Sequence, residues 1–289
     1  MSVCSIINKE LAKMLMPSRA KQSNKGTFGK VLNFSGCKEY VGAAYLSSVS
    51  ALRVGAGLVE LAAPSCVKTS VAALSPDIVF SDIYSHSYIE AVPKNINFNQ
   101  YSAVIVGCGL GNNRFTNKFL KNLIEQLKNF DVPVVYDADA LNIISEEGLV
   151  NLGKKVIITP HPGEMARLMG SSVADVQAAR NDFVRMAAQK YNAVTVLKGY
   201  NTLVASPDGK VFKDVVGTNV LAKAGMGDVL SGIIAGLLAQ GLNCKQSAVL
   251  GVYLHSQAGL VGEKVRTQYG LLASELVDFI PDGIKSIIL

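Results

Sequence analysis

The sequence predicts an α/β fold: a central, mostly parallel sheet with helices on both faces and an antiparallel hairpin at one edge. Short apolar runs alternate with segments of helical periodicity, which is the order of β-α-β units. The connections are short, and this favours parallel strands joined by right-handed crossovers. Late in the chain, Ser206-Pro-Asp-Gly209 lies between two short strand patterns and predicts a hairpin.

The first half of the chain repeats this order of strands and helices. Residues 3–16 have helical periodicity, and the polar residues that follow them predict a connecting arm. Apolar runs that stop at glycine or proline predict strands, and the small or amphipathic segments between them predict helices. In chain order we expect helix 3–16, arm 17–25, strand 31–35, helix 40–55, strand 57–63, strand 103–106, helix 115–128 and strand 132–136.

The second half ends in helices. Val156 to Thr159 is a short β-branched run, and residues 173–190 form a long amphipathic pattern. After the hairpin the chain is apolar at helical spacing almost to its last residue. In chain order we expect strand 156–159, helix 173–190, strand 193–197, hairpin strands 202–205 and 210–213, and helices 228–240, 246–264 and 271–279.

The composition excludes several classes of protein. Of the 289 residues, 49% are hydrophobic and 17% are charged, so the chain can bury a large core, and we expect a single domain over residues 1–289. The longest apolar runs are too short to span a membrane, and residues 1–25 lack the uncharged core of a secretory signal. The net charge of +6 comes from scattered Lys and Arg, which favours small anionic ligands and gives no case for nucleic acid.

Cysteine and histidine usage points to a reducing compartment. The five cysteines have no CxxC spacing, and the three histidines lie far apart in the sequence. This pattern indicates neither a disulfide framework nor a zinc site. We therefore expect reduced thiols and a cytoplasmic location.

A glycine-rich loop, residues 217–228, precedes a long apolar helix. Gly225 and Gly227 allow backbone torsions and a close ligand approach that a side chain would block. The first turn of a helix has N–H groups without helical partners, and the helix dipole attracts anions to that end. The loop therefore predicts a phosphate cradle with the Asp228 carboxylate at its rim. A simple glycine turn in which Asp228 only caps the helix is the alternative.

Other glycine and polar residues follow predicted strands, where the ligands of parallel sheets bind. They are Gly36, Gly107–Gly111, Asp137–Asp139, His161–Glu164 and Lys198–Gly199. The second group reads Gly-Cys-Gly-Leu-Gly, which differs from the G-x-G-x-x-G of a dinucleotide fold. It predicts close contact between the backbone and some ligand instead.

Two of these groups place carboxylates at strand ends. A helix cap would explain one of the two residues Asp137 and Asp139, and a role near a Mg²⁺-bound phosphate would explain the other. The prolines of Thr159-Pro-His-Pro-Gly-Glu164 hold their loop rigid. We expect His161 to contact a ligand and Glu164 to orient a metal or water.

Lys198-Gly-Tyr-Asn-Thr202 places a cation, a glycine and a hydroxyl group beyond another strand. A point charge on a flexible stem suits a nucleotide phosphate. A solvated lysine in a turn is the alternative.

Taken together, the motifs resemble one known family. The matching segments are Gly26–Leu32, Tyr40–Ala44, Ala51–Val59, Asp137–Leu141, Thr159–Glu164, Leu197–Gly199 and Ala222–Gly232. In this order, over about residues 25–280, they resemble the ADP/ATP-dependent NAD(P)H-hydrate dehydratases of the ribokinase-like superfamily. The Gly-x-Gly-Asp motif alone would indicate only the superfamily.

The resemblance implies a ribokinase-like fold and a lyase that repairs the 6S water adduct of a reduced nicotinamide dinucleotide, NADHX or NADPHX. In bacterial-type members ADP phosphorylates the ring hydroxyl, and elimination of phosphate regenerates NADH or NADPH, leaving AMP. Other members use ATP. Mg²⁺ is the implied cofactor, since it screens the phosphate charge.

The resemblance also implies roles for residues. Asp228 is the implied catalytic group, and Gly225 and Gly227 belong to the turn whose amides face the phosphate. The hydrated dinucleotide is expected at Ala43, Gly109, His161 and Asp228, the nucleotide at Lys198, Gly199, Tyr200, Asn201, Thr202 and Gly227, and the metal at Glu164.

Some features depart from the family pattern or extend beyond it. Ala224 and Met226 stand where the family commonly has Gly and Ser or Thr, so a hydroxyl contact to phosphate is missing at position 226. Residues 1–25 are too few for the epimerase domain often fused in this family, so any epimerase is expected as a separate protein. The resemblance suggests a homotetramer, although the small-residue helices 42–55 and 228–240 could pack within one subunit or between subunits.

Two other functions compete with this interpretation. One is a ribokinase-like kinase for a small alcohol such as a vitamin precursor, which tends to carry Asn at the position of His161. The other is a non-catalytic nucleotide sensor, which the presence of Asp228 disfavours.

Overall fold

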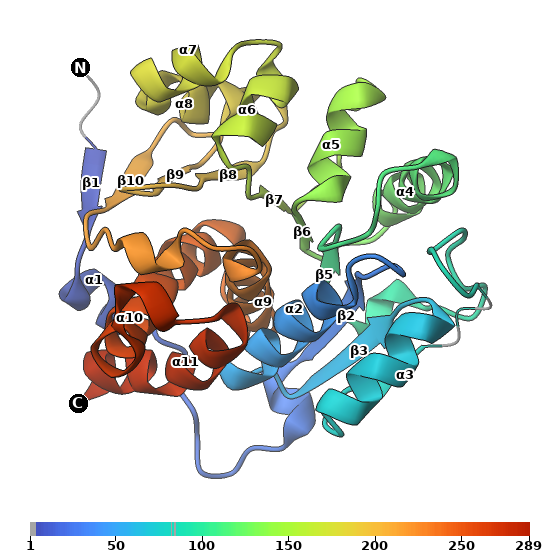
Figure 1. Ribbon diagram of the computed structural model, residues 1–289, viewed down its shortest axis with the longest axis horizontal. Coiled ribbons are helices and arrows are strands. Elements are labelled where there is room, and N and C mark those ends of the chain that lie inside the picture. Colours follow the sequence, from blue (N-terminus) through green and yellow to red (C-terminus); the bar gives the residue numbers. More distant parts are fainter. Residues whose placement is uncertain (1–3, 82, 84) are drawn as a thin grey trace.

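The computed structural model describes residues 4–81, 83 and 85–289. The described residues form a ten-stranded sheet in the order β1-β10-β9-β8-β7-β6-β5-β2-β3-β4 (Figure 1). All neighbouring strands are parallel except that β9 is antiparallel to both β8 and β10. The strands are β1 (Cys4–Ile7), β2 (Lys30–Phe34), β3 (Leu58–Ala62), β4 (Val79–Phe80), β5 (Ala103–Val106), β6 (Val134–Tyr136), β7 (Val156–Ile158), β8 (Val194–Leu197), β9 (Leu203–Ala205) and β10 (Val211–Asp214).

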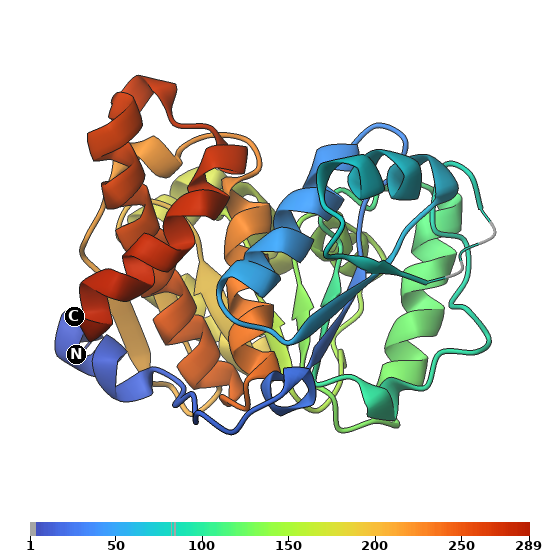
Figure 2. The same cartoon turned by 90° about the horizontal axis from the view of Figure 1, so that it is seen from below.

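Helices cover both faces of this sheet, as the sequence predicts. One layer holds α2, α9, α10 and α11, and the other holds α4, α5, α6 and α8 (Figures 1 and 2). The helices are α1 (Lys9–Leu15), α2 (Val41–Arg53), α3 (Ser65–Leu74), α4 (Arg114–Leu127), α5 (Asp139–Glu146), α6 (Pro162–Met169), α7 (Val173–Ala178), α8 (Arg180–Lys190), α9 (Met226–Ala239), α10 (Cys244–Gly270) and α11 (Ala273–Ile288).

The central strands are apolar on both sides because helices bury both of their faces. All four residues of β5 are completely buried. Ile105 points to the layer that contains α9, whereas its neighbours Val104 and Val106 point to the layer that contains α4. The middle of the sheet therefore has no free face, and a ligand can reach it only at the strand ends.

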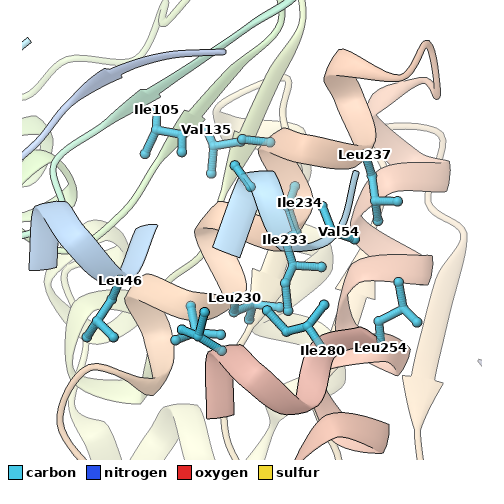
Figure 3. Close-up of a cluster of buried hydrophobic side chains, with 14 of the residues drawn as sticks. Leu46, Val54, Ile105, Val135, Leu230, Ile233, Ile234, Leu237, Leu254 and Ile280 are labelled. Atoms are coloured by element: carbon cyan, nitrogen blue, oxygen red, sulfur yellow. The ribbon is translucent and has the colours of Figure 1, made fainter. Parts of the chain in front are cut away.

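Helix α9 is buried almost all round, because it lies between the sheet, α2 and the C-terminal helices (Figure 3). Gly232 and Gly236 let it approach α2 closely. A Cβ atom at Gly232 would lie 2.3 Å from the Ser47 carbonyl oxygen, and one at Gly236 would lie 2.6 Å from that of Ala51. The small residues of these two helices therefore pack against each other within one chain.

The prediction of one helix over residues 3–16 is wrong. Cys4–Ile7 forms the edge strand β1, which pairs in parallel with β10, and α1 begins only after Asn8, whose side chain accepts a hydrogen bond from the Leu11 N–H. Ile7 is buried while Ile6 is 48% exposed, which is the alternation of a strand. The partner strand lies about 200 residues later in the chain, so local periodicity did not reveal it. The predicted β9–β10 hairpin is confirmed, with β1 added outside it.

Other boundaries also differ from the sequence-based expectation. The pattern over residues 173–190 predicts one helix, but the chain turns at Ala179 and forms α7 and α8. The last predicted helix, 271–279, continues to Ile288 as α11 with Pro281 inside it. Helix α3 and the two-residue strand β4 lie in a stretch for which no element is predicted. Among the described helices, none combines the length and apolar character that crossing a membrane requires.

Candidate active site

A pocket of about 630 Å³ lies beyond the carboxyl ends of β6, β7 and β8, where the sequence predicts a ligand. The first turn of α9 and the loop before it form one wall, and the loops after β7 and β8 form the other. Predicted residues that line it are Asp137, His161, Glu164, Lys198, Gly199, Tyr200, Asn201, Thr202, Gly225, Gly227 and Asp228. Ala43 and Gly109 are not among the residues that line this pocket.

The glycine-rich loop ends in the turn that starts α9. Gly225 is the N-cap in the left-handed region, with φ +85°, a conformation in which a Cβ would also meet the side chains of Leu46 and Ala273. Gly227 is helical, and a Cβ there would lie 3.2 Å from the Lys198 Nζ atom. Position 227 therefore favours glycine because Lys198 approaches it closely, and not because the backbone there has an unusual torsion. No side chain caps this helix; the Met226 N–H donates to the Lys223 carbonyl oxygen at 3.4 Å, which leaves the N–H groups of Gly227 and Asp228, two residues that line the pocket, for a ligand.

Asp228 stands in the first turn of α9 and is partly buried. Burial, with a smaller contribution from the nearby Asp137 carboxylate, raises the pKa of its carboxyl group to about 7. A hydrogen bond with the Cys108 thiol opposes this and lowers the pKa. A carboxyl group whose pKa lies near 7 can accept a proton from a substrate hydroxyl group and release it again. This favours a chemical role for Asp228 over that of a simple helix cap.

Lys198 and Asp137 form a buried ion pair at the floor of the pocket. The Nζ atom of Lys198 lies 2.7 Å from Asp137 Oδ1 and 3.7 Å from Glu164 Oε2. The second oxygen of Asp137 accepts a hydrogen bond of 2.7 Å from the Ser231 hydroxyl. Burial lowers the pKa of Lys198, but the carboxylates of Asp137 and Glu164 outweigh it and hold the pKa above its usual range. Lys198 is thus a fixed cation and not a solvated turn lysine.

The His161–Glu164 loop is organised by the start of α6, with Pro162 in its first turn. The Glu164 Oε2 atom accepts the His161 N–H at 2.7 Å, and His161 Nδ1 accepts the N–H groups of Gly163 and Glu164 at 2.9 and 3.4 Å. Because Nδ1 accepts, the proton of the neutral imidazole is on Nε2, which lies 3.5 Å from Glu164 Oε1.

Burial and nearby charges shift the pKa values of both His161 and Glu164. Burial lowers the pKa of His161, and the positive charge of Lys198 lowers it further. Burial raises the pKa of Glu164 to about 7, and the Lys198 cation opposes that shift. The pair therefore presents a neutral imidazole at the pocket rim and a carboxyl group that changes charge near neutral pH.

The glycines after β5 bring two predicted substrate residues together. Gly109 has φ +60°, and a Cβ there would lie 2.7 Å from the Ala43 Cβ atom. Asp139, the first residue of α5, accepts the N–H of Gly111 at 2.8 Å and so ties this loop to α5. Neither Asp137 nor Asp139 caps α5 through its side chain, so the predicted cap is absent.

The structure fits Mg²⁺ as an ion held mostly by substrate and water. Mg²⁺ prefers oxygen ligands and usually combines one or two carboxylates with phosphate oxygens and water. Asp137 already uses both oxygens, on Lys198 and Ser231, and Glu164 uses one on a backbone N–H. Cys108 Sγ and oxygens of Asp137 and Asp228 lie within 4.8 Å of one another, but a thiol is a poor ligand for this hard ion.

Local sequence patterns do not identify several residues that line the pocket or contact the residues that do. Ser231 lies three positions after Asp228, so helical spacing alone could have placed both on one face. Asp214 and Ser256 line the far side of the pocket and are hydrogen-bonded to each other, although they are 42 residues apart. Cys108 lies within the Gly107–Gly111 motif, and no local signal indicates that its thiol forms a hydrogen bond with Asp228.

Comparisons with known proteins agree with this geometry. Residues 31–282 match the family described as NAD(P)H-hydrate dehydratase. An ADP-dependent (S)-NAD(P)H-hydrate dehydratase from Neisseria meningitidis is 38% identical over 265 residues, covering 90% of this chain and 86% of the relative. A bifunctional NAD(P)H-hydrate repair enzyme from Moorella thermoacetica is 35% identical over 281 residues, covering 94% of this chain. The chain spans about half the length of such bifunctional relatives, 52% in this case.

Solved structures give the same result. The ADP/ATP-dependent NAD(P)H-hydrate dehydratase from Bacillus subtilis, co-crystallised with ATP and Mg²⁺, superposes with a TM-score of 0.88 at 28% identity. The alignment covers 99% of this chain and all of that one. A hydroxyethylthiazole kinase from Pyrococcus horikoshii, at a TM-score of 0.64 and 14% identity, shares the fold alone.

Proposed function

Because this chain belongs to the NAD(P)H-hydrate dehydratase family, we propose that it is an ADP-dependent dehydratase of (6S)-NADHX and (6S)-NADPHX. The products would be NADH or NADPH, AMP and phosphate. The single observation that carries the proposal is Asp228, a carboxylate poised near neutral pKa at the start of α9 and beside the fixed cation Lys198. Such a site suits phosphoryl transfer to a hydroxyl group.

In the first step, Asp228 accepts the proton of the ring hydroxyl group, and the oxygen of that hydroxyl group attacks the terminal phosphoryl group of ADP. The new P–O bond forms as the bond to the leaving AMP breaks. The N–H groups of the first α9 turn and the Lys198 ammonium group offset the negative charge that develops. In the second step the ring loses phosphate and a proton, which restores its double bond.

The remaining assigned residues hold the two ligands. We propose that Ala43, Gly109 and His161 bind the hydrated dinucleotide, with the Nε2–H of His161 as a donor. Lys198, Gly199, Tyr200, Asn201 and Thr202 bind the nucleotide together with Gly227. Mg²⁺, when bound, neutralises phosphate charge. The backbone N–H of His161 donates to Glu164 Oε2, and we propose that the other oxygen of Glu164, Oε1, orients the water ligands of Mg²⁺.

The cellular setting is proposed on separate grounds. All five cysteines are free, which suits a reducing, cytoplasmic compartment. We propose a homotetramer from the family resemblance. We also propose that this chain is a single domain and that the epimerase with which it acts is a separate protein. The bifunctional name of the longer relatives supports such a partnership between activities.

The test is the return of reduced-nicotinamide absorbance when purified protein is mixed with Mg²⁺, chemically prepared NADHX or NADPHX, and either ADP or ATP. We expect recovery only with nucleotide, with ADP the better donor, and no recovery with Asp228→Asn. Folded protein that gives no recovery with either nucleotide would reject the dehydratase. Phosphorylation of a small alcohol in a substrate panel would then support the kinase alternative, and nucleotide binding without turnover would support the sensor.

A further inference from the structure

The break between α7 and α8 interrupts a segment whose periodicity predicts one continuous helix. Ala179 has φ −131° and ψ 43°, and it ends α7 and begins α8. A break exposes backbone groups that a continuous helix would pair, so it carries a cost. The residue placed at the new helix start is Arg180, which points to a local reason for the break.

The guanidinium group of Arg180 holds the backbone at the end of β8. Its Nη2 atom donates to the carbonyl oxygens of Leu197 and Lys198 at 3.1 and 3.3 Å. Its Nη1 atom donates to the Gln177 Oε1 atom at 3.1 Å, which links the guanidinium back to α7. The planar fork of an arginine can serve two neighbouring carbonyl groups at once, and a lysine cannot copy that geometry.

The loop after β8 has little freedom once these carbonyls are held. Gly199 has φ +132°, and a Cβ there would lie 3.1 Å from Arg180 Nη1. The Thr202 hydroxyl donates to the Gly199 carbonyl oxygen at 2.9 Å. Within the described chain, the carbonyl groups of Leu197, Lys198 and Gly199 thus all face protein donors.

A planar trans peptide directs its N–H opposite to its carbonyl group. With the Lys198 and Gly199 carbonyls turned toward Arg180 and Thr202, the next two N–H groups, of Gly199 and Tyr200, point away from those donors. Within the described part of the chain no acceptor for either N–H is found. Both residues line the pocket, and successive free N–H groups in a tight turn form an anion-binding surface.

We propose that Arg180 is a positioning residue for the nucleotide: by holding the Lys198 carbonyl, it turns the Gly199 amide toward a nucleotide phosphate, beside the Tyr200 amide that the Thr202–Gly199 hydrogen bond orients. The inference rests on the nucleotide-dependent function proposed above. Arg180 does not line the pocket, so it acts through the loop and not by direct contact. It therefore affects the nucleotide and leaves the hydrate-binding side, at Ala43 and Gly109, unchanged.

The experiment compares Arg180→Ala, Arg180→Lys and the wild type. The matched control is Lys190→Ala, because Lys190 lies at the other end of α8 and also donates to a backbone carbonyl, that of Leu168 at 2.7 Å. Binding of ADP and of ATP is titrated with Mg²⁺ and no hydrate, and KM for nucleotide and for hydrate is measured separately. Thermal unfolding reports whether each variant is folded.

We expect Arg180→Ala to weaken nucleotide binding roughly 10- to 100-fold, the range for hydrogen bonds that involve a charged group. Arg180→Lys should fall between Arg180→Ala and the wild type. KM for the hydrate should stay within about twofold in both variants, as should the nucleotide affinity of the Lys190→Ala control. If Arg180→Ala does not fold, Arg180→Lys carries the same comparison.

Three outcomes would overturn the assignment: unchanged nucleotide affinity, a parallel rise in hydrate KM, or an equal loss in the Lys190→Ala control. Wild-type protein that binds ADP or ATP but does not repair NADHX would reject the dehydratase alone, and the titration would still test Arg180. Wild-type protein that binds neither nucleotide would reject both proposals.

Discussion

The two ends of the sheet both carry a large pocket, yet only one looks like an active site. At the amino ends of β5–β8 a cavity of about 880 Å³ is bordered by lysines and aspartates. Its charges are exposed: Lys155 and Asp131 are 2.7 Å apart, and their side chains are 48% and 71% exposed. The smaller pocket at the carboxyl ends instead holds Asp137 and Lys198, which are 1% and 18% exposed.

The environment of the charged groups, and not the size of the cavity, distinguishes the candidate active site from the cavity at the other end of the sheet. In the amino-end cavity Lys155 lowers the pKa of Asp131, which keeps that carboxyl group ionised as it would be in water. In the carboxyl-end pocket burial raises the pKa of Asp228 to about 7. Burying ionisable groups away from water lowers the stability of a protein, and groups with strongly shifted pKa values therefore cluster at functional sites.

Asp228→Asn should show the largest effect on activity at the carboxyl end. Loss of the proton acceptor should lower kcat roughly 10²- to 10⁴-fold. It should also stabilise the protein at pH 8. The folded-state pKa of about 7 lies above the usual value of 3.8, so the contribution of Asp228 to stability is full below pH 3.8 and is lost as the pH rises toward 7.

Thermal unfolding of wild type and Asp228→Asn at pH 8 and at pH 4 measures that second effect. We expect the variant to gain on the order of 2 kcal/mol at pH 8 and nothing at pH 4. A variant that is less stable at pH 8 would show that Asp228 supports the fold and would weaken the contrast between the two ends.

Lys198→Met should combine a loss of activity with a loss of stability. It leaves the buried Asp137 without its cation, and breaking a buried ion pair typically costs about 3–5 kcal/mol. Adding Asp137→Asn should recover much of the stability and none of the nucleotide affinity. Chemical denaturation and ADP titration of both variants separate the two roles. Recovered affinity in the double variant would argue that Lys198 only neutralises Asp137.

Cys108→Ala should have a smaller effect that depends on pH. The thiol lowers the pKa of Asp228, so its removal should move the acid limb of the rate profile to higher pH. We expect a rate loss of roughly threefold at pH 6.5 and little change at pH 8.5. Cys108→Ser keeps a donor at this position and should restore the wild-type profile. An equal loss at every pH would contradict the thiol's influence on Asp228.

Lys155→Ala at the amino-end cavity should have the smallest effect. An exposed ion pair contributes about 0–1 kcal/mol, and this cavity lies at the opposite end of the sheet from Asp228. Steady-state rates with NADHX and ADP should therefore match the wild type. A marked fall in rate would mean that the amino-end cavity also binds a ligand.

The sequence by itself predicted the parts of this protein that local pattern controls. Short apolar runs identified β2, β3 and β5–β8, and β5, which is buried on both faces, is apolar throughout. The rule that ligands bind beyond the carboxyl ends of parallel strands then put His161, Lys198 and Asp228 in one place.

Only the tertiary structure decided the features that depend on partners distant in the chain. Cys4–Ile7 became a strand because β10 offers it an unpaired edge, and α7 separated from α8 where Arg180 meets the end of β8. The pairing of Asp137 with Lys198 spans 61 residues. Hydrogen bonds and burial act through space, so periodicity reveals which residues can be buried, and the folded chain alone determines which charges are buried together.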